Sequence, residues 1–129
     1  MVNKFEKELE TIGVNLTDIQ KKQFDRYYEL LIEWNKVMNL TGITEYDEVN
    51  LKHFTDSLTI VRVMDMEKVH MLIDVGTGAG FPGIPINIAF PHVRVVLLVS
   101  LNKRVKFLNT VIDELELVYI EAVHGRAED

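Results

Sequence analysis

The amino-acid sequence predicts an α/β fold in which a helical N-terminal region, residues 1–68, precedes the first half of a doubly wound parallel sheet, residues 69–129. In the first region, apolar residues recur at helical spacing. In the second region, three short apolar runs alternate with two helical patterns. The first of these runs leads directly into three glycines at alternate positions, within residues 74–83. This glycine stretch is the feature on which the functional interpretation depends.

Two helices are predicted before residue 40. The first covers residues 1–12, and Gly13 is placed as its C-cap. The second covers residues 18–38, because Thr17 and Gln20 have the spacing of a capping box and apolar residues continue at helical spacing to the end. Its aromatic residues could stack on nucleic-acid bases, but this spacing is more typical of a buried core.

A third helix is predicted over residues 46–63, with Thr44 as its N-cap. His53, Asp56 and Ser57 fall within it, and these residue types could form a hydrolase or metal site. A helix spreads them over different faces, however, and no nucleophile elbow surrounds Ser57. Packing and hydrogen bonding are therefore the favoured roles.

Strands and helices are predicted to alternate after a linker at residues 64–68. The predicted strands cover residues 71–75, 93–99 and 118–123. One helix starts near Pro82 and stops before Pro91, since prolines are tolerated only in its first turn. Ser100 is predicted to cap the next helix. Right-handed crossovers between parallel strands then give the spatial order 3-2-1.

Composition limits the classes of function. With 14 basic and 20 acidic residues, the net charge of −6 argues against nucleic-acid binding by overall charge. The one tight basic cluster is Lys103, Arg104 and Lys106, which either contacts RNA phosphates or forms a solvated helix face. The absence of cysteine excludes disulfides and thiolate metal sites, and no metal is expected. The sequence contains no signal peptide or membrane-spanning run, so we expect a cytoplasmic protein.

The glycine spacing excludes two nucleotide-binding motifs. A dinucleotide fingerprint needs glycine at the sixth position from Gly76, where this chain has Phe81. A Walker A loop needs Lys and then Ser or Thr after its last glycine, and neither follows. The remaining pattern, Asp-x-Gly-x-Gly-x-Gly after a strand, resembles the first motif of S-adenosylmethionine-dependent methyltransferases with a Rossmann-like fold. A glycine-rich turn without a ligand is the simpler alternative.

Two separated groups of motifs resemble one family. The first comprises residues 34–41 (WNKVMNLT) with His53, Asp56, Ser57 and Leu58. The second comprises residues 74–83, 100–104 and 126–128. Together they resemble the glucose-inhibited division protein B family, bacterial methyltransferases that make a 7-methylguanosine in 16S ribosomal RNA. The resemblance implies S-adenosylmethionine as cofactor and 16S ribosomal RNA or the small ribosomal subunit as partner, with no membrane involved.

The resemblance also implies a set of cofactor-binding residues, whereas the identity of any catalytic residue stays unknown at this point. Backbone groups of the glycines would approach the amino-acid moiety, the acid would lie near its ammonium group, and the aromatic ring would lie against the ligand. The residues after the second strand would lie beside the ribose and adenine, and those after the third strand would border the adenine. The expected residues are Asp74, Gly76, Gly78, Gly80, Phe81, Ser100, Leu101, Ala127 and Glu128.

Two features depart from the family pattern. Where the family has an acid that hydrogen-bonds the ribose, this chain has Val99. Rossmann-like methyltransferases also use a larger sheet and a later arginine-bearing segment, so the chain is expected to be truncated after the third strand and inactive alone. The first strand, residues 71–75, would then be an open edge through which we expect self-association, unless the helical region covers it. The alternative function is a non-catalytic fragment or binding module that retains the fold without cofactor binding.

Overall fold

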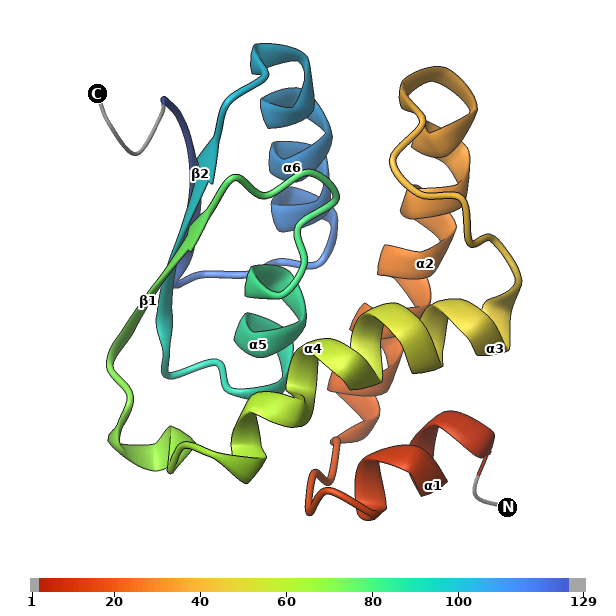
Figure 1. Cartoon of the computed structure of the whole chain (residues 1–129), viewed down its shortest axis with the longest axis vertical. Helices are drawn as coiled ribbons and strands as arrows, with labels where there is room; N and C mark the ends of the chain where they lie inside the picture. The colour runs from red at the N-terminus through yellow and green to blue at the C-terminus, as the bar shows by residue number, and fades with distance from the viewer. Residues whose placement is uncertain (1–2, 126–129) are drawn as a thin grey trace.

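The computed structural model describes residues 3–125 and places the sheet on one side of the molecule and the helices on the other (Figure 1). The helical region contains α1 (Lys4–Glu10), α2 (Asp18–Met38), α3 (Tyr46–Val49), η1 (Asn50–Thr55), α4 (Asp56–Leu58), η2 (Thr59–Arg62) and η3 (Met66–Lys68). The α/β part contains β1 (Met71–Val75), α5 (Gly83–Ala89), β2 (Arg94–Val99), α6 (Asn102–Glu114) and β3 (Ile120–His124). The predicted α/β class, with the first part of a Rossmann-like sheet, is confirmed.

α2 has its predicted bounds because both ends carry strong local signals. The Thr17 side chain accepts a hydrogen bond from the Gln20 amide at 3.2 Å, and the Gln20 side chain accepts one from the Thr17 amide at 2.7 Å. At the other end, Asn39 takes the left-handed conformation with φ 51°. The buried residues of α2 are Phe24, Tyr27, Leu30 and Leu31. The aromatic stripe therefore lies largely in the core, as its spacing predicted.

Three predicted helix caps are wrong. α1 ends at Glu10 with Thr11 as its C-cap, while Gly13, with φ +78°, lies in the turn that follows. α3 is capped by the Glu45 side chain, which accepts from the Asp47 amide at 2.6 Å, and not by Thr44. α6 begins at Asn102 after Leu101 and has no side-chain cap, so Ser100 does not cap it. In each case the capping residue lies close to the predicted one, and the backbone conformation decides between neighbours.

The predicted single helix over residues 46–63 is helical from Tyr46 to Arg62 but changes its hydrogen-bond pattern. A short α-helical turn passes into the π-helical η1, then into α4 and the 3₁₀-helical η2. The widened turn of η1 packs against α1, and α4 packs against α5. The predicted linker at residues 64–68 also contains a 3₁₀ turn, η3, whose Met66 is buried and whose carbonyl bonds to His92 at 2.8 Å.

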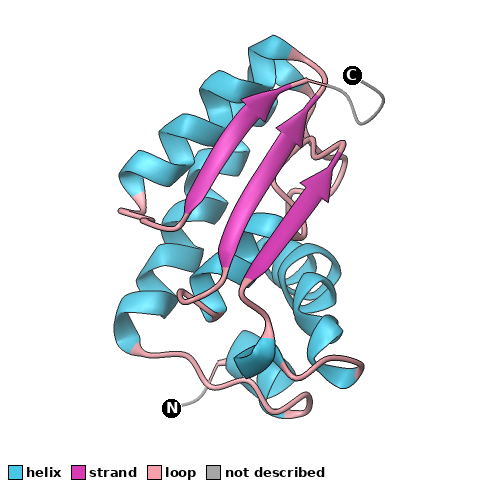
Figure 2. Ribbon diagram, turned by 90° about the vertical axis from the view of Figure 1, so that its left-hand side faces the viewer, coloured by secondary structure: helices cyan, strands magenta, loops and turns pink. Residues whose placement is uncertain are grey.

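The sheet is parallel, with β2 between β1 and β3, which confirms the predicted order. Val75 pairs with Leu98, and Leu98 pairs with Val123, so the strands end at nearly the same level. α5 and α6 cover one face. Among the described residues no helix covers the other face, and Ile73 and Val75 of β1 are 59% and 58% exposed there (Figure 2). β1 is therefore an edge strand with an apolar exposed face.

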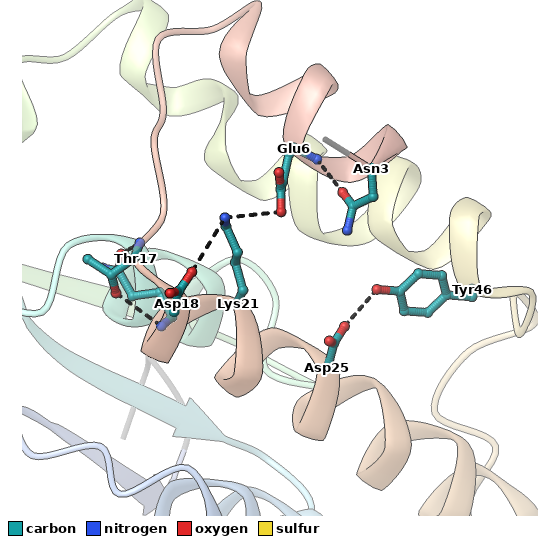
Figure 3. Close-up of polar contacts among 8 residues, drawn as sticks. Asn3, Glu6, Thr17, Asp18, Lys21, Asp25 and Tyr46 are labelled. Carbon is teal, nitrogen blue, oxygen red and sulfur yellow. Dashed lines mark hydrogen bonds and ion pairs between the residues drawn. The ribbon is translucent and has the colours of Figure 1, made fainter. Parts of the chain in front are cut away.

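A single buried hydrophobic cluster joins the helical region to the sheet. Polar contacts reinforce the helical region around α2 (Figure 3): Lys21 pairs with Glu6 of α1 at 3.1 Å, and Tyr46 of α3 donates to Asp25 at 2.6 Å. Both pairs are partly exposed, so each contributes little alone. Within residues 3–125, no helix combines the length and apolar character needed to cross a bilayer.

Candidate functional site

The carboxyl ends of the three strands meet at one edge of the sheet, where ligands bind in doubly wound folds. The Gly76 amide donates to the Leu98 carbonyl at 2.9 Å, and the Gly125 amide donates to the Val99 carbonyl at 2.9 Å. These bonds bring the start of the glycine loop, residues 76–83, beside the turn that follows β2. The predicted cofactor residues Gly76, Gly78, Ser100 and Leu101 therefore come from neighbouring strand ends.

The glycines of this loop serve different purposes. Gly76 has φ +77°, which favours glycine, and a side chain placed there would meet nothing within 4 Å. Gly80 has φ +96°, and a Cβ atom there would lie 2.6 Å from Ile84 and 2.7 Å from the Tyr27 hydroxyl. Gly76 thus leaves open space above the backbone at the strand end, whereas Gly80 lets the loop pack against the helices.

Asp74 lies under the loop and holds its two ends together. Its carboxylate accepts from the Gly83 amide at 3.0 Å, and within the loop the Thr77 hydroxyl oxygen accepts from the Gly80 amide at 3.1 Å. Asp74 is only 7% exposed, and this burial raises the pKa of its carboxyl group against the lowering effect of the neighbouring Gly83 amide and Thr77 side chain. The contact between Asp74 and the ammonium group of the cofactor remains a prediction.

Phe81 belongs to an aromatic cluster contributed mainly by the helical region. Its ring stacks on His53 with centroids 4.5 Å apart and an interplanar angle of 13°. Thr41 Oγ1 lies within hydrogen-bond distance of His53 Nε2, at 2.7 Å, and burial lowers the pKa of His53. The Tyr27 hydroxyl donates to the Ala79 carbonyl inside the loop. Two helical segments therefore fix the position of the glycine loop.

Sequence reasoning missed the contact of His53 and Tyr27 with the loop. The helical spacing of Tyr27 indicated only core, and the packing role expected of His53 named no partner. Ser57 donates to the His53 carbonyl, which agrees with hydrogen bonding in place of catalysis. The only sequence feature that could have indicated where His53 lies is its grouping with residues 34–41 in the motif that resembles the family. Within residues 3–125, no group of three His, Asp or Glu side chains could hold a metal ion.

A cavity of about 570 Å³ adjoins Phe81 on the side of α4 and η2. Its lining residues are Asp56, Ser57, Thr59, Ile60, Val63, Phe81 and Pro82. Gly76, Gly78, Ser100 and Leu101 do not line it, so Phe81 is the one predicted site residue that it shares with the strand-end site. The space therefore lies beside Phe81 and not over the other predicted site residues that the structure describes.

The residues after β2 are accessible, but the last residue of this strand offers no polar side chain to a ligand. Ser100 is exposed and Leu101 is 48% exposed, so both are accessible beside the loop. Val99 is fully buried and has no polar side-chain atom, so it cannot accept from ribose hydroxyls. Ala127 and Glu128, predicted to border the adenine, lie outside the described residues.

Comparison with models of known protein families gives a match. The family model for rRNA small subunit methyltransferase G matches residues 20–129. The chain belongs to this family.

Similar proteins carry the name ribosomal RNA small subunit methyltransferase G. A relative from Lachnoclostridium phytofermentans is 55% identical over 94% of this chain and 50% of its own length. A relative from Bacillus velezensis is 51% identical over 98% of this chain and 53% of its own length. The chain thus spans about half the length of the curated relatives it matches, and that half includes the glycine loop.

Proposed function

We propose that this chain forms the S-adenosylmethionine-binding half of an enzyme that methylates a guanine of 16S ribosomal RNA to 7-methylguanosine. The observation that carries this proposal is the glycine loop at the carboxyl end of β1, where Gly76 leaves open space above the backbone. Family membership supports methyl transfer to ribosomal RNA. The cofactor, the guanine target and the cytoplasmic location are parts of the proposal.

The proposed reaction depends more on the positions of the methyl donor and the guanine than on acid–base catalysis. When bound, S-adenosylmethionine supplies an electrophilic methyl group on a sulfonium centre. Guanine N7 carries a lone pair and no proton, so the chain does not have to remove a proton before attack. The tasks left to the chain are to hold the donor through the backbone of the glycine loop and to fix that loop through Asp74, Tyr27 and His53.

Local positive charge supports RNA as the partner. Lys103 and Lys106 are exposed near the start of α6, at the carboxyl edge of the sheet. The overall charge of −6 repels RNA, so contact through this edge would orient the substrate toward the glycine loop. The half of the relatives' length that this chain does not span would supply the remaining RNA contacts.

A second candidate function is a binding module or non-catalytic fragment without cofactor. The buried Val99 favours it, because loss of the ribose acceptor weakens cofactor binding. Isothermal titration with S-adenosylmethionine separates the two candidates, since a methyltransferase half must bind the donor. Measurable binding is expected, and absence of heat at millimolar donor would favour the binding module.

Turnover provides an independent test. We expect no transfer of tritiated methyl groups to small ribosomal subunits by this chain alone, because the target guanine lacks the part of the site that the other half of the relatives would provide. Transfer above a no-enzyme control would show that the chain is catalytically sufficient. Transfer that appears only after addition of the remaining half of a relative would support the proposed division of roles.

A further inference from the structure

Arg104 in the first turns of α6 reaches over the glycine loop. Its Nη1 atom lies 2.8 Å from the position that a Cβ atom on Gly78 would occupy, and its Cζ atom lies 3.6 Å from that position. No positive φ requires glycine at this residue, unlike at Gly76 and Gly80. The guanidinium group occupies the space beside the loop backbone, so a side chain at Gly78 would displace it.

The guanidinium group of Arg104 has no partner among the described residues. Arg26 pairs with Glu114 at 3.1 Å and Arg94 pairs with Glu121 at 3.8 Å, whereas the Arg104 side chain makes no hydrogen bond or ion pair within residues 3–125. Arg62, also without such a partner, is exposed, but Arg104 is half-buried. A half-buried guanidinium group has lost part of its hydration and still presents five donors. The position of the Arg104 guanidinium group therefore favours binding of an anion.

The nearest acid of the loop is already engaged. Asp74 accepts from the Gly83 amide on the buried side of the loop. Among residues 3–125 no acid is placed to pair with Arg104, so a ligand placed above Gly78 is a source of the anion that this geometry favours. A carboxylate suits the planar fork of a guanidinium group, because the two groups can form paired hydrogen bonds.

We propose that Arg104 binds the carboxylate of the amino-acid moiety of S-adenosylmethionine. The inference rests on the proposed function and adds to it a side chain that selects the amino-acid end of the cofactor. RNA phosphate is the competing source of an anion. The half-buried position of Arg104 against the loop favours the cofactor, whereas the neighbouring Lys103 and Lys106 are exposed and better placed for phosphates.

Two ligands and two matched variants test this assignment by titration calorimetry. S-adenosylhomocysteine carries the carboxylate, and 5′-methylthioadenosine keeps the adenosine but lacks the amino-acid group. Arg104→Gln removes the guanidinium group, and Lys103→Gln removes the adjacent exposed charge. We expect Arg104→Gln to weaken S-adenosylhomocysteine binding by about tenfold or more and to change 5′-methylthioadenosine binding by less than about twofold. Lys103→Gln should leave both ligands within about twofold.

The other possible outcomes contradict either the proposed function or the role of Arg104. If the unsubstituted chain binds no S-adenosylhomocysteine, the proposed function fails and the role of Arg104 fails with it. If that chain binds and Arg104→Gln binds equally well, or weakens both ligands equally, the role of Arg104 alone is wrong. Loss of affinity for an RNA oligonucleotide without loss for S-adenosylhomocysteine would assign Arg104 to phosphate. Should Arg104→Gln fail to fold by circular dichroism, Arg104→Lys, which keeps the charge and removes the fork, is expected to show an intermediate and equally ligand-selective loss.

Discussion

The hydrogen bond from Tyr27 to the glycine loop should contribute measurably to stability. Tyr27 is fully buried, and its hydroxyl donates to the Ala79 carbonyl, which is also buried. Burial and the nearby charge of Asp74 raise the pKa of Tyr27 well above its usual range, so the hydroxyl keeps its proton as a donor at neutral pH. Tyr27→Phe would keep the ring stacked on Phe54 and would remove only this donor.

The expected magnitude follows from burial. Loss of a donor that leaves a buried carbonyl unsatisfied costs about 1–3 kcal/mol of unfolding free energy. Tyr28→Phe is a matched control, because the Tyr28 hydroxyl also donates to a backbone carbonyl, that of Thr44 at 2.6 Å, in an exposed position. Water can replace that donor, so the loss should stay below about 0.5 kcal/mol.

Urea denaturation followed by circular dichroism measures both variants. We expect Tyr27→Phe to lower the midpoint, at unchanged denaturant dependence, clearly more than Tyr28→Phe does. Equal losses in the two variants would refute the view that Tyr27 holds the loop. A loss at Tyr27 with unchanged S-adenosylhomocysteine affinity would show that the bond stabilises the fold without shaping the site.

Four further outcomes are expected. Burial raises the pKa of Asp74, so ionisation of this carboxyl group lowers the stability of the fold as the pH rises above the ordinary pKa of an aspartate. The side-chain oxygen of Asp74→Asn can still accept from Gly83, so this variant should melt no lower at pH 7 but should bind S-adenosylhomocysteine more weakly. A strong loss of stability would contradict this. Burial lowers the pKa of His53 although Asp56 raises it, so below about pH 6.5 the unfolded chain binds protons more readily than the folded chain does. Between pH 7.5 and pH 5.5 the melting temperature of the unsubstituted chain should therefore fall by more than that of His53→Gln. Val99→Asp should cost about 1–3 kcal/mol because the residue is fully buried, and should tighten S-adenosylhomocysteine binding by about tenfold; unchanged affinity would place the ribose elsewhere. Ile73→Lys on the exposed β1 edge should shift the chain toward monomer in light scattering, and a chain already monomeric at high concentration would exclude self-association through that edge.

Elements with strong local signals could be predicted from the sequence. α2 begins after the capping box of Thr17 and Gln20 and ends at the left-handed Asn39, and each signal lies within a few residues. The positions of β1 and β2 followed from short apolar runs, whereas β3 begins two residues later than the predicted run at residue 118. The strand order followed from the handedness of crossovers. The glycine loop was recognisable because its spacing excluded the competing nucleotide-binding motifs.

Features set by distant contacts could not be predicted in this way. The π-helical η1 lies inside a continuous helical pattern, and its residues carry no local sign of a wider turn. The glycine pattern did not distinguish Gly76, which faces open space, from Gly80, which packs against Tyr27 and Ile84. The burial of the Val99 side chain and the position of Arg104 over Gly78 likewise depend on how β2 and α6 pack.

Backbone NMR during titration with S-adenosylhomocysteine tests the central claim most directly, because it reports binding and its location together. We expect saturable chemical-shift changes at the amides of Gly76, Gly78, Ser100 and Leu101, the residues at the carboxyl ends of β1 and β2. Residues around the apolar groove lined by Ile19 and Val118, at the opposite ends of the strands, should remain unchanged. Absence of shifts at millimolar ligand, or saturable shifts confined to that groove, would contradict a cofactor site on the glycine loop.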